Sequence, residues 1–141
     1  YITPEKSGYI YDDQGIKGGL KVAVPFVILG DLNASNVDGN AINSGISSLL
    51  HHENIQDVMP QSQGARIHTQ DNINAKYHTA FWKMRADYVL PSKVGIEVKD
   101  SGVYWPTEDE DTFRLIKDRA ASSDHRMVWL DLVVKDILNT L

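Results

Sequence analysis

Apolar residues concentrate in a few runs along the chain, and each run predicts one element. Residues 21–29 are almost continuously apolar, which predicts a strand buried on both faces, with Pro25 limiting its start or marking a sheet edge. Residues 85–90 predict a short strand that Pro91 ends. In residues 125–134 both alternating faces are apolar, so this strand needs cover on both sides.

Helical spacing is clearest between the first two of these strands. Isoleucine and leucine recur with that spacing over about residues 38–52, which predicts a helix capped by Asn36 or Asp38. The polar stretch 54–77 predicts a long loop, and a loop of that size in a compact domain is often functional. Residues 94–105 predict one or two further strands.

The two ends of the chain lack apolar periodicity. Residues 1–20 form a predicted loop segment rich in Gly, Asp and Lys, and residues 135–141 form a predicted tail. Residues 107–110 match a capping box before a short helix. The 141 residues amount to one domain or part of one, and the opening loop leads us to expect a piece of a longer protein.

Composition narrows the class of protein further. Hydrophobic residues make up 42% and charged residues 23%, which is ordinary globular usage and excludes a disordered tail. The net charge of −5 disfavours a basic nucleic-acid-binding module but allows an enzyme that meets phosphate through a cation. Because cysteine is absent, disulfides, thiolate metal sites and thiol catalysis are excluded. No apolar run approaches the ~18 residues of a membrane span.

Three short polar clusters stand at the ends of apolar runs, where open α/β sheets place their ligands. They read GDLN over residues 30–33, RADY over 85–88 and SSDH over 122–125. Taken singly, each is a common pattern, because an Asp after a strand usually caps or turns the chain. Taken in this order, they resemble the endonuclease/exonuclease/phosphatase family, in which a G-D-x-N turn, a D-Y strand and an S-D-H turn follow one another.

The resemblance extends over most of the chain, from about residue 22 to residue 132, and is nearest to bacterial, apparently exported members. It implies metal-dependent hydrolysis of phosphate esters, as a phosphodiesterase, nuclease or phosphomonoesterase. The sequence does not determine the cellular compartment of the protein. No motif identifies the substrate beyond its being a phosphate ester.

The resemblance also implies a role for each residue of the motifs. Asp31 would position or activate water, or protonate the leaving group, and Asn33 would hydrogen-bond the scissile phosphate or the attacking water. Asp124 would bind Mg²⁺ (or Mn²⁺ or Ca²⁺), because hard cations prefer oxygen ligands. His125 would contact the phosphate, and Asp87 would orient His125 and favour its charged form.

Other polar and aromatic residues have less distinctive surroundings. Arg85 could bind substrate, although a solvated strand residue is the favoured interpretation. Tyr88 is expected to pack in the core. Two aromatic residues before the second cluster either line a pocket rim or pack in the core, and the sequence favours neither role. Structural roles are favoured for the remaining histidines, of which two end the predicted helix and two lie in or beside the polar loop. These four histidines and two aromatic residues are His51, His52, His68, His78, Phe81 and Trp82.

The family fold is a four-layer α/β sandwich of two face-to-face sheets with helices outside. Its N-terminal half supplies an Asn and a metal-binding Glu, for which the sequence offers no counterpart. We therefore expect residues 1–141 to be the C-terminal portion of such a domain, with a mainly antiparallel or mixed sheet and helices on one face. Alone, this half would bind Mg²⁺ weakly and turn over slowly or not at all.

A half-domain would also expose the apolar sheet face meant for the absent half. Such patches are rarely left in water, so we expect that missing half, or a second copy in a homodimer, to cover it. The alternative to an enzyme is a non-catalytic binding or scaffold domain derived from the same fold, and a self-contained small α/β binding domain is a weaker third interpretation. A scaffold has no physical need for all five polar side chains of the motifs.

Overall fold

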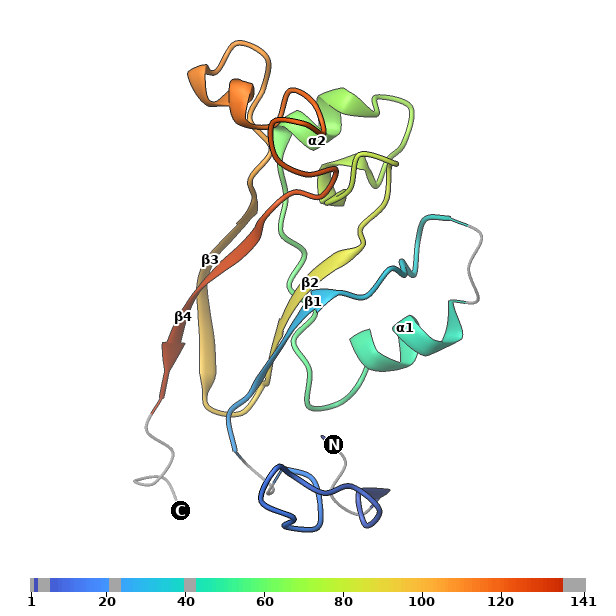
Figure 1. Ribbon diagram of the computed structural model, residues 1–141, viewed down its shortest axis with the longest axis vertical. Helices are drawn as coiled ribbons and strands as arrows, with labels where there is room; N and C mark the ends of the chain where they lie inside the picture. The colour runs from blue at the N-terminus through green and yellow to red at the C-terminus, as the bar shows by residue number, and fades with distance from the viewer. Residues whose placement is uncertain (1, 3–5, 21–23, 40–42, 136–141) are drawn as a thin grey trace.

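The computed structural model describes residues 2, 6–20, 24–39 and 43–135 of the chain (Figure 1). It is a mixed α/β structure with antiparallel sheets and few helices, as the sequence predicted. The elements, in chain order, are β1 (Val27–Asp31), α1 (Ser44–Leu50), α2 (Gln63–His68), the 3₁₀ helix η2 (Ala75–Tyr77), β2 (Asp87–Pro91), β3 (Ile96–Val103), the 3₁₀ helix η3 (Asp111–Leu115) and β4 (Val128–Val134).

The four strands form two antiparallel pairs that lie against each other. β1 pairs with β2, and β3 pairs with β4 with an irregularity between Val98 and Asp100. β2 contacts β4, so the two pairs adjoin and run in the same general direction in Figure 1. The β1–β2 register places Asp31 opposite Asp87, at the end of one strand and the start of the other.

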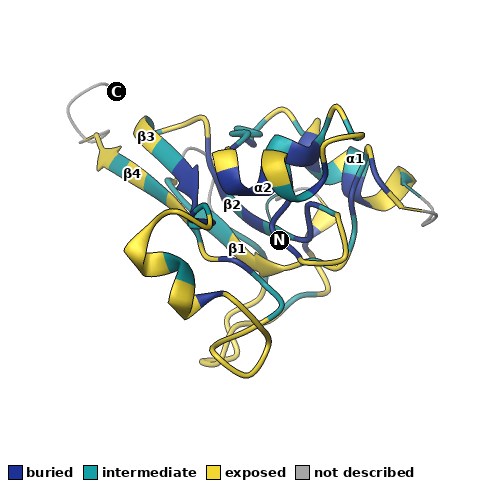
Figure 2. Ribbon diagram, turned by 90° about the horizontal axis from the view of Figure 1, so that it is seen from above, coloured by how far each residue is buried: buried dark blue, intermediate teal, exposed yellow. Residues whose placement is uncertain are grey.

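Two apolar clusters form the core. One lies between α1 and the β1–β2 pair, and its buried members are Ile46, Leu50, Ile55, Tyr88 and Leu90. The second joins α2 to β3 and to the segment after it, and its buried members are Ala65, Val103, Trp105 and Ile116. Figure 2 shows the buried positions gathered on α1, α2 and β2, whereas exposed positions recur along β4.

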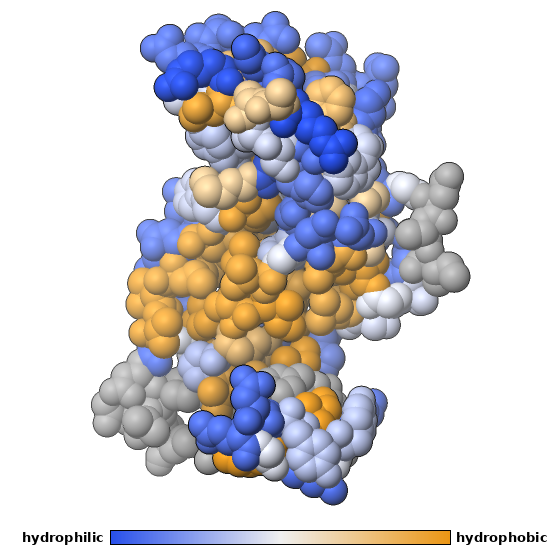
Figure 3. All heavy atoms as spheres, viewed as in Figure 1, coloured by the Kyte–Doolittle hydropathy of each residue, from blue (hydrophilic) through white to orange (hydrophobic). Residues whose placement is uncertain are grey.

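The strand predictions are confirmed in type, but not the expected burial on both faces. Residues 21–23 lie outside the described residues, and β1 carries Leu29 with 70% of its surface exposed. On β4, Trp129 and Val133 are also exposed, while the opposite face of the strand is half-buried. Figure 3 shows a broad apolar patch over the strands on the face seen in Figure 1.

The predicted helix over residues 38–52 is wrong in extent. Residues 40–42 lie outside the described residues, and α1 begins at Ser44 after Asn43. Asp38 does not cap it, because its carboxylate accepts the side-chain amide of Asn72 at 2.8 Å, 34 residues further along the chain. The Asp38 side chain, which the local sequence predicts as a helix cap, thus bonds instead to a residue far away in the chain.

The predicted long loop over residues 54–77 is also wrong, because it contains α2 and η2. Ser62 caps α2 by accepting the backbone N–H of Ala65. Gly64 brings the helix against Trp105 so closely that a Cβ there would lie 2.1 Å from the Trp105 carbonyl oxygen. Packing against a distant tryptophan, rather than apolar periodicity, holds this short helix in place.

Only half of the capping box predicted at residues 107–110 forms, and Glu110, not Thr107, is the N-cap of the 3₁₀ helix that follows. The Glu110 carboxylate accepts both the backbone N–H and the hydroxyl of Thr107 at 2.8 and 3.0 Å. Within residues 1–20, a bridge joins Tyr11 to Lys17, and residues 136–141 lie outside the described residues. Across the part of the chain that the structure describes, no helix is long and apolar enough to cross a membrane.

Candidate active site

The turn after β1 presents Asp31 and Asn33 as one unit. Gly30, with φ of +147°, has a conformation that other residues rarely adopt, and Asn33, with φ of +48°, is left-handed, where asparagine is enriched. The Asp31 carboxylate accepts the Asn33 backbone N–H at 2.8 Å through one oxygen and its side-chain amide at 2.9 Å through the other. Both side chains are therefore fixed at the strand end.

His125 lies between the two carboxylates that face each other across β1 and β2. Its Nδ1 is 3.0 and 3.1 Å from the two Asp87 oxygens, and its Nε2 is 3.9 Å from Asp31 Oδ2. One ligand atom from each of the three residues lies within 4.8 Å of the others. About a third of the His125 and Asp31 side chains is exposed (30% and 34%), so the cluster is open to a solute.

The surrounding carboxylates change the titration of His125. The hydrogen bond to Asp87 raises the pKa of His125 above its ordinary value, against the opposing effect of partial burial. The charges of Asp87, Asp31 and Asp124 act in the same direction as that hydrogen bond. Because Nδ1 is bonded to Asp87, the geometry places a proton on Nδ1 and points Nε2 towards Asp31.

Asp124 lies beside this cluster rather than in it. Its carboxylate is 3.5 Å from the Arg119 guanidinium, and its backbone carbonyl accepts the N–H of Phe81 at 2.8 Å. The Arg119 side chain is 81% exposed, so this ion pair contributes little and leaves Asp124 accessible. Of the five motif residues, the structure brings Asp31, Asn33, Asp87 and His125 together.

Arg85 is buried, contrary to the expectation of a solvated strand residue. Only 1% of its surface is exposed, and its guanidinium donates to Asp57 Oδ1 at 2.9 Å and to the Val58 carbonyl at 2.8 Å. It also stacks on the Tyr88 ring, with 4.3 Å from Cζ to the ring centroid. Tyr88 packs in the core as predicted, and burial raises its pKa to about 12. Arg85 therefore holds the polar segment after α1 against β2.

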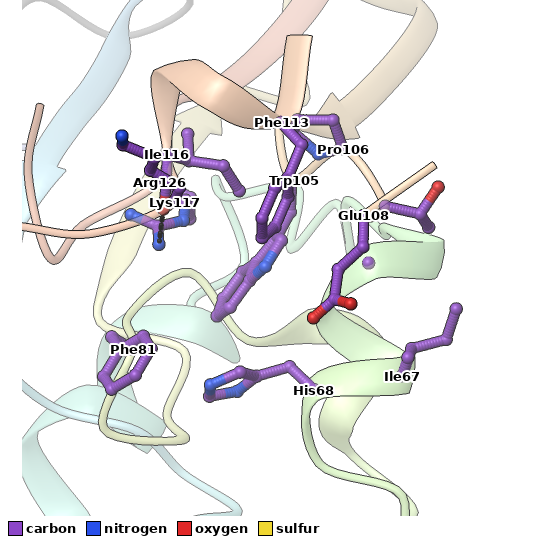
Figure 4. A pocket seen from close by; sticks show the side chains of 12 residues that line it. Ile67, His68, Phe81, Trp105, Pro106, Glu108, Phe113, Ile116, Lys117 and Arg126 are labelled. Atoms are coloured by element: carbon purple, nitrogen blue, oxygen red, sulfur yellow. Dashed lines mark hydrogen bonds between the residues drawn. The ribbon is translucent and has the colours of Figure 1, made fainter. Parts of the chain in front are cut away.

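Two aromatic residues flank the cluster. The Trp82 ring meets His125 edge-on, with ring centroids 4.7 Å apart, and is 43% exposed at the rim. Phe81 contacts His68, which also contacts Trp105 at 4.9 Å between ring centroids. The rings of Phe81, His68 and Trp105 line a cavity of about 240 Å³ (Figure 4).

The histidines outside the cluster have structural surroundings. His51 ends α1, with Nδ1 2.8 Å from the Ser47 carbonyl. His78 is fully buried 3.4 Å from Asp38, and burial lowers its pKa below the ordinary value. Burial likewise lowers the pKa of His68.

Sequence reasoning missed Thr79, whose buried hydroxyl donates to Asp87 Oδ2 at 2.7 Å. A threonine eight positions before Asp87 carries no local signal of such a contact.

The donor chemistry of the site fits a hard divalent cation in part. The Asp31 and Asp87 carboxylates and the His125 imidazole form the one candidate group of metal ligands among the described residues. Mg²⁺ commonly takes only one or two protein carboxylates and fills its remaining positions with water and phosphate oxygens. Asp87 is already engaged by His125 and Thr79, and both Asp31 oxygens accept from Asn33. Asp124, outside the cluster, is paired with the exposed Arg119 and is the motif carboxylate that a cation could most readily engage.

Comparison with known proteins agrees with this geometry. A model of the endonuclease/exonuclease/phosphatase family matches residues 2–125, which is most of the 141-residue chain. No curated protein and no solved structure matches the chain. With the motif residues gathered at one strand edge and the family match spanning them, the chain belongs to the endonuclease/exonuclease/phosphatase family.

Proposed function

We propose that this chain contributes the second half of the active site of a divalent-metal-dependent phosphoesterase. The family is one of phosphoester hydrolases, and the observation that carries the proposal is the position of His125 between Asp87 and Asp31. An imidazole held by one carboxylate and facing another, open to solvent, is an arrangement suited to acid–base work on a bound phosphate ester.

His125 and Asp87 act as a pair in this proposal. Asp87 accepts the Nδ1 proton, which fixes the ring and favours the imidazolium, and Nε2 donates to a non-bridging oxygen of the phosphate. Transfer of a phosphoryl group depends on such positioning and on neutralising the equatorial oxygens. The edge-on contact with Trp82 further limits rotation of the His125 ring.

Asp31 and Asn33 act on the water and the leaving group. Asp31 orients the attacking water or protonates the leaving oxygen, and its rigid pairing with Asn33 supports either role. The side-chain oxygen of Asn33 remains able to accept a hydrogen bond from the attacking water. Arg85 does not contact substrate in this proposal, because its side chain is buried against Asp57.

We infer that Asp124 holds the cation, Mg²⁺ or else Mn²⁺ or Ca²⁺. When bound, the cation would polarise the phosphate and neutralise charge that the protein residues leave uncompensated. Asp124 is free for this role once its exposed partner Arg119 swings away.

We also propose that the chain is the C-terminal portion of its domain and works slowly or not at all by itself. The support is the apolar patch over the strands, which a second layer would cover (Figure 3). The exposed apolar residues of the strands include Leu29, Trp129 and Val133. A scaffold role is not favoured, because a purely structural domain does not require a partly exposed His between two carboxylates.

The test is hydrolysis of a phosphodiester and a phosphomonoester, such as bis-p-nitrophenyl and p-nitrophenyl phosphate, with Mg²⁺, by the longest natural polypeptide that contains this chain. His125→Ala should lower kcat by about 10²–10⁴-fold, the usual contribution of general acid–base catalysis. His51→Ala is the matched control, since His51 ends α1 away from the cluster. If the protein were a scaffold, the wild type would show no Mg²⁺-dependent hydrolysis, and His125→Ala would change nothing. Robust activity of residues 1–141 alone would contradict the half-site proposal.

A further inference from the structure

We propose that Thr79 is a positioning residue that fixes Asp87 and His125 relative to each other. The inference rests on the proposed function, in which that pair acts on the phosphate. Thr79 is 1% exposed and lies outside all three sequence motifs, eight residues before Asp87.

The hydrogen bonds of Thr79 leave its hydroxyl a single orientation. The oxygen accepts the backbone N–H groups of Ala86 and Asp87, each at 2.9 Å. A hydroxyl has two acceptor sites and one proton, so both acceptor sites are occupied by amides. The proton is then directed to Asp87 Oδ2, 2.7 Å away. The hydroxyl cannot rotate to another partner without leaving a buried amide unpaired.

The backbone of Thr79 attaches the other member of the pair. Its carbonyl accepts the N–H of Arg126, the residue after His125, at 2.7 Å. The next residue, Ala80, forms an antiparallel bridge with His125 itself. One residue thus holds Asp87 through its side chain and the His125 segment through its main chain.

The Thr79 hydroxyl and the His125 imidazole contact the same oxygen of the Asp87 carboxylate. Asp87 Oδ2 receives the Thr79 hydroxyl at 2.7 Å and lies 3.0 Å from His125 Nδ1. A carboxylate held by both groups cannot turn away from the imidazole, so His125 keeps Nδ1 towards Asp87 and Nε2 towards Asp31. Without the hydroxyl, Asp87 would keep its charge but lose the contact that sets its rotation.

The segment that carries Thr79 is itself firmly held. The preceding residue, His78, is fully buried beside Asp38, and Asp38 accepts the side-chain amide of Asn72 at 2.8 Å. Thr79 N–H donates to the Met84 carbonyl at 3.0 Å, which closes the turn that carries Trp82. A rigid support of this kind is what a positioning role requires, because misplacement by about 1 Å can cost about 10²-fold in rate.

The test compares Thr79→Val, which has nearly the same shape without the hydroxyl, with Thr79→Ser, which keeps the hydroxyl. Thr69→Val is the control for removing a hydroxyl from a buried threonine, since Thr69 ends α2 away from the cluster. In the longer polypeptide, Thr79→Val should lower kcat by about 10–10²-fold with KM within about twofold, as expected for lost positioning. Thr79→Ser and Thr69→Val should stay within about twofold of the wild-type kcat.

A second measurement is independent of turnover. In the proton NMR spectrum, the Nδ1–H resonance of His125 should be downfield and slow to exchange in the wild type and in Thr79→Ser, and lost to exchange in Thr79→Val. An unchanged Nδ1–H resonance in a folded Thr79→Val would overturn the inference, whatever the activity. If the wild type has no activity but the resonance responds as expected, the proposed function fails and the positioning role stands.

Thr79→Val leaves the buried N–H groups of Ala86 and Asp87 without their acceptor, which destabilises the fold. If it does not fold, the wild-type hydroxyl proton of Thr79 decides the matter. A hydroxyl proton bonded to Asp87 should be observable and protected from exchange in the wild type, and should disappear in Asp87→Ala. A Thr79 hydroxyl proton that exchanges freely in the wild type would contradict the inference.

Discussion

Asp31 and Asp87 are direct cross-strand partners at one end of the β1–β2 pair, although 56 positions separate them in the chain. Like charges opposite each other in a sheet are unfavourable. His125 lies between them, 3.0 Å from Asp87 and 3.9 Å from Asp31, and its imidazolium form compensates both charges. The arrangement therefore stabilises a protonated histidine at an open edge of the sheet.

The first prediction concerns pH. Because the pKa of His125 is raised, a reaction that requires its imidazolium should stay active above the ordinary histidine pKa of about 6.5 and decline as pH rises through the raised value. Asp87→Asn removes the main cause of the shift, so the alkaline limb of kcat against pH should move to lower pH. An alkaline limb unmoved by Asp87→Asn would contradict this assignment.

The same shift has a consequence for stability. A histidine whose pKa is higher in the folded than in the unfolded state stabilises the fold fully below the unfolded value. That contribution is lost as pH rises through the folded value of His125. The free energy of unfolding of the wild type, measured with denaturant, should therefore fall slightly across this pH interval. The free energy of unfolding of His125→Gln should not show this fall. Equal pH dependence in both proteins would show that another group is responsible.

The second prediction concerns Arg85 as a structural residue. Arg85→Ala should lower the free energy of unfolding by roughly 3 kcal/mol, because it removes one partner of a buried ion pair and leaves Asp57 uncompensated. The Asp57 side chain is 25% exposed, which keeps the loss at the lower end of the range for buried pairs. Urea unfolding measures this loss.

Arg85→Met is the companion variant, because it keeps the apolar part of the side chain over Tyr88. It should lose less stability than Arg85→Ala, since packing on the ring is partly retained. If either variant folds fully but has a raised KM, Arg85 contacts substrate and its structural assignment is wrong.

The third prediction compares the effects of adding a methyl group at Gly64 and at Gly45, which both lie in short helices. Gly64→Ala in α2 should destabilise by about 1–3 kcal/mol or more, because its Cβ would lie 2.1 Å from the Trp105 carbonyl oxygen. Gly45→Ala in α1 has nothing within 4 Å of the added Cβ and should stabilise by about 0.5–1 kcal/mol. Thermal unfolding of both variants beside the wild type measures the contrast, and equal effects would show that α2 does not pack on Trp105 as described.

The fourth prediction concerns the apolar patch over the strands. Residues 1–141 alone should self-associate in sedimentation velocity, because an apolar surface of this breadth is rarely left in water. Leu29→Lys, at a position that is 70% exposed, should shift the distribution towards monomer. Ile73→Lys is the control, since Ile73 is 91% exposed and lies between α2 and η2 rather than on a strand. A monodisperse wild-type monomer would contradict this prediction.

The sequence by itself determined the family and the α/β class, and it located three of the four strands to within about three residues at each end, whereas β1 begins at Val27 rather than at residue 21. It did so because GDLN, RADY and SSDH are local motifs, and because a turn such as Asp31–Asn33 is set by side chains two positions apart. Only the tertiary structure decided which groups surround them. Thr79 contacts Asp87, Arg85 contacts Asp57, and α2 forms where Gly64 meets Trp105. Each of these contacts joins segments through packing and burial, whose energy depends on what the rest of the fold brings near and leaves no periodic trace in the chain.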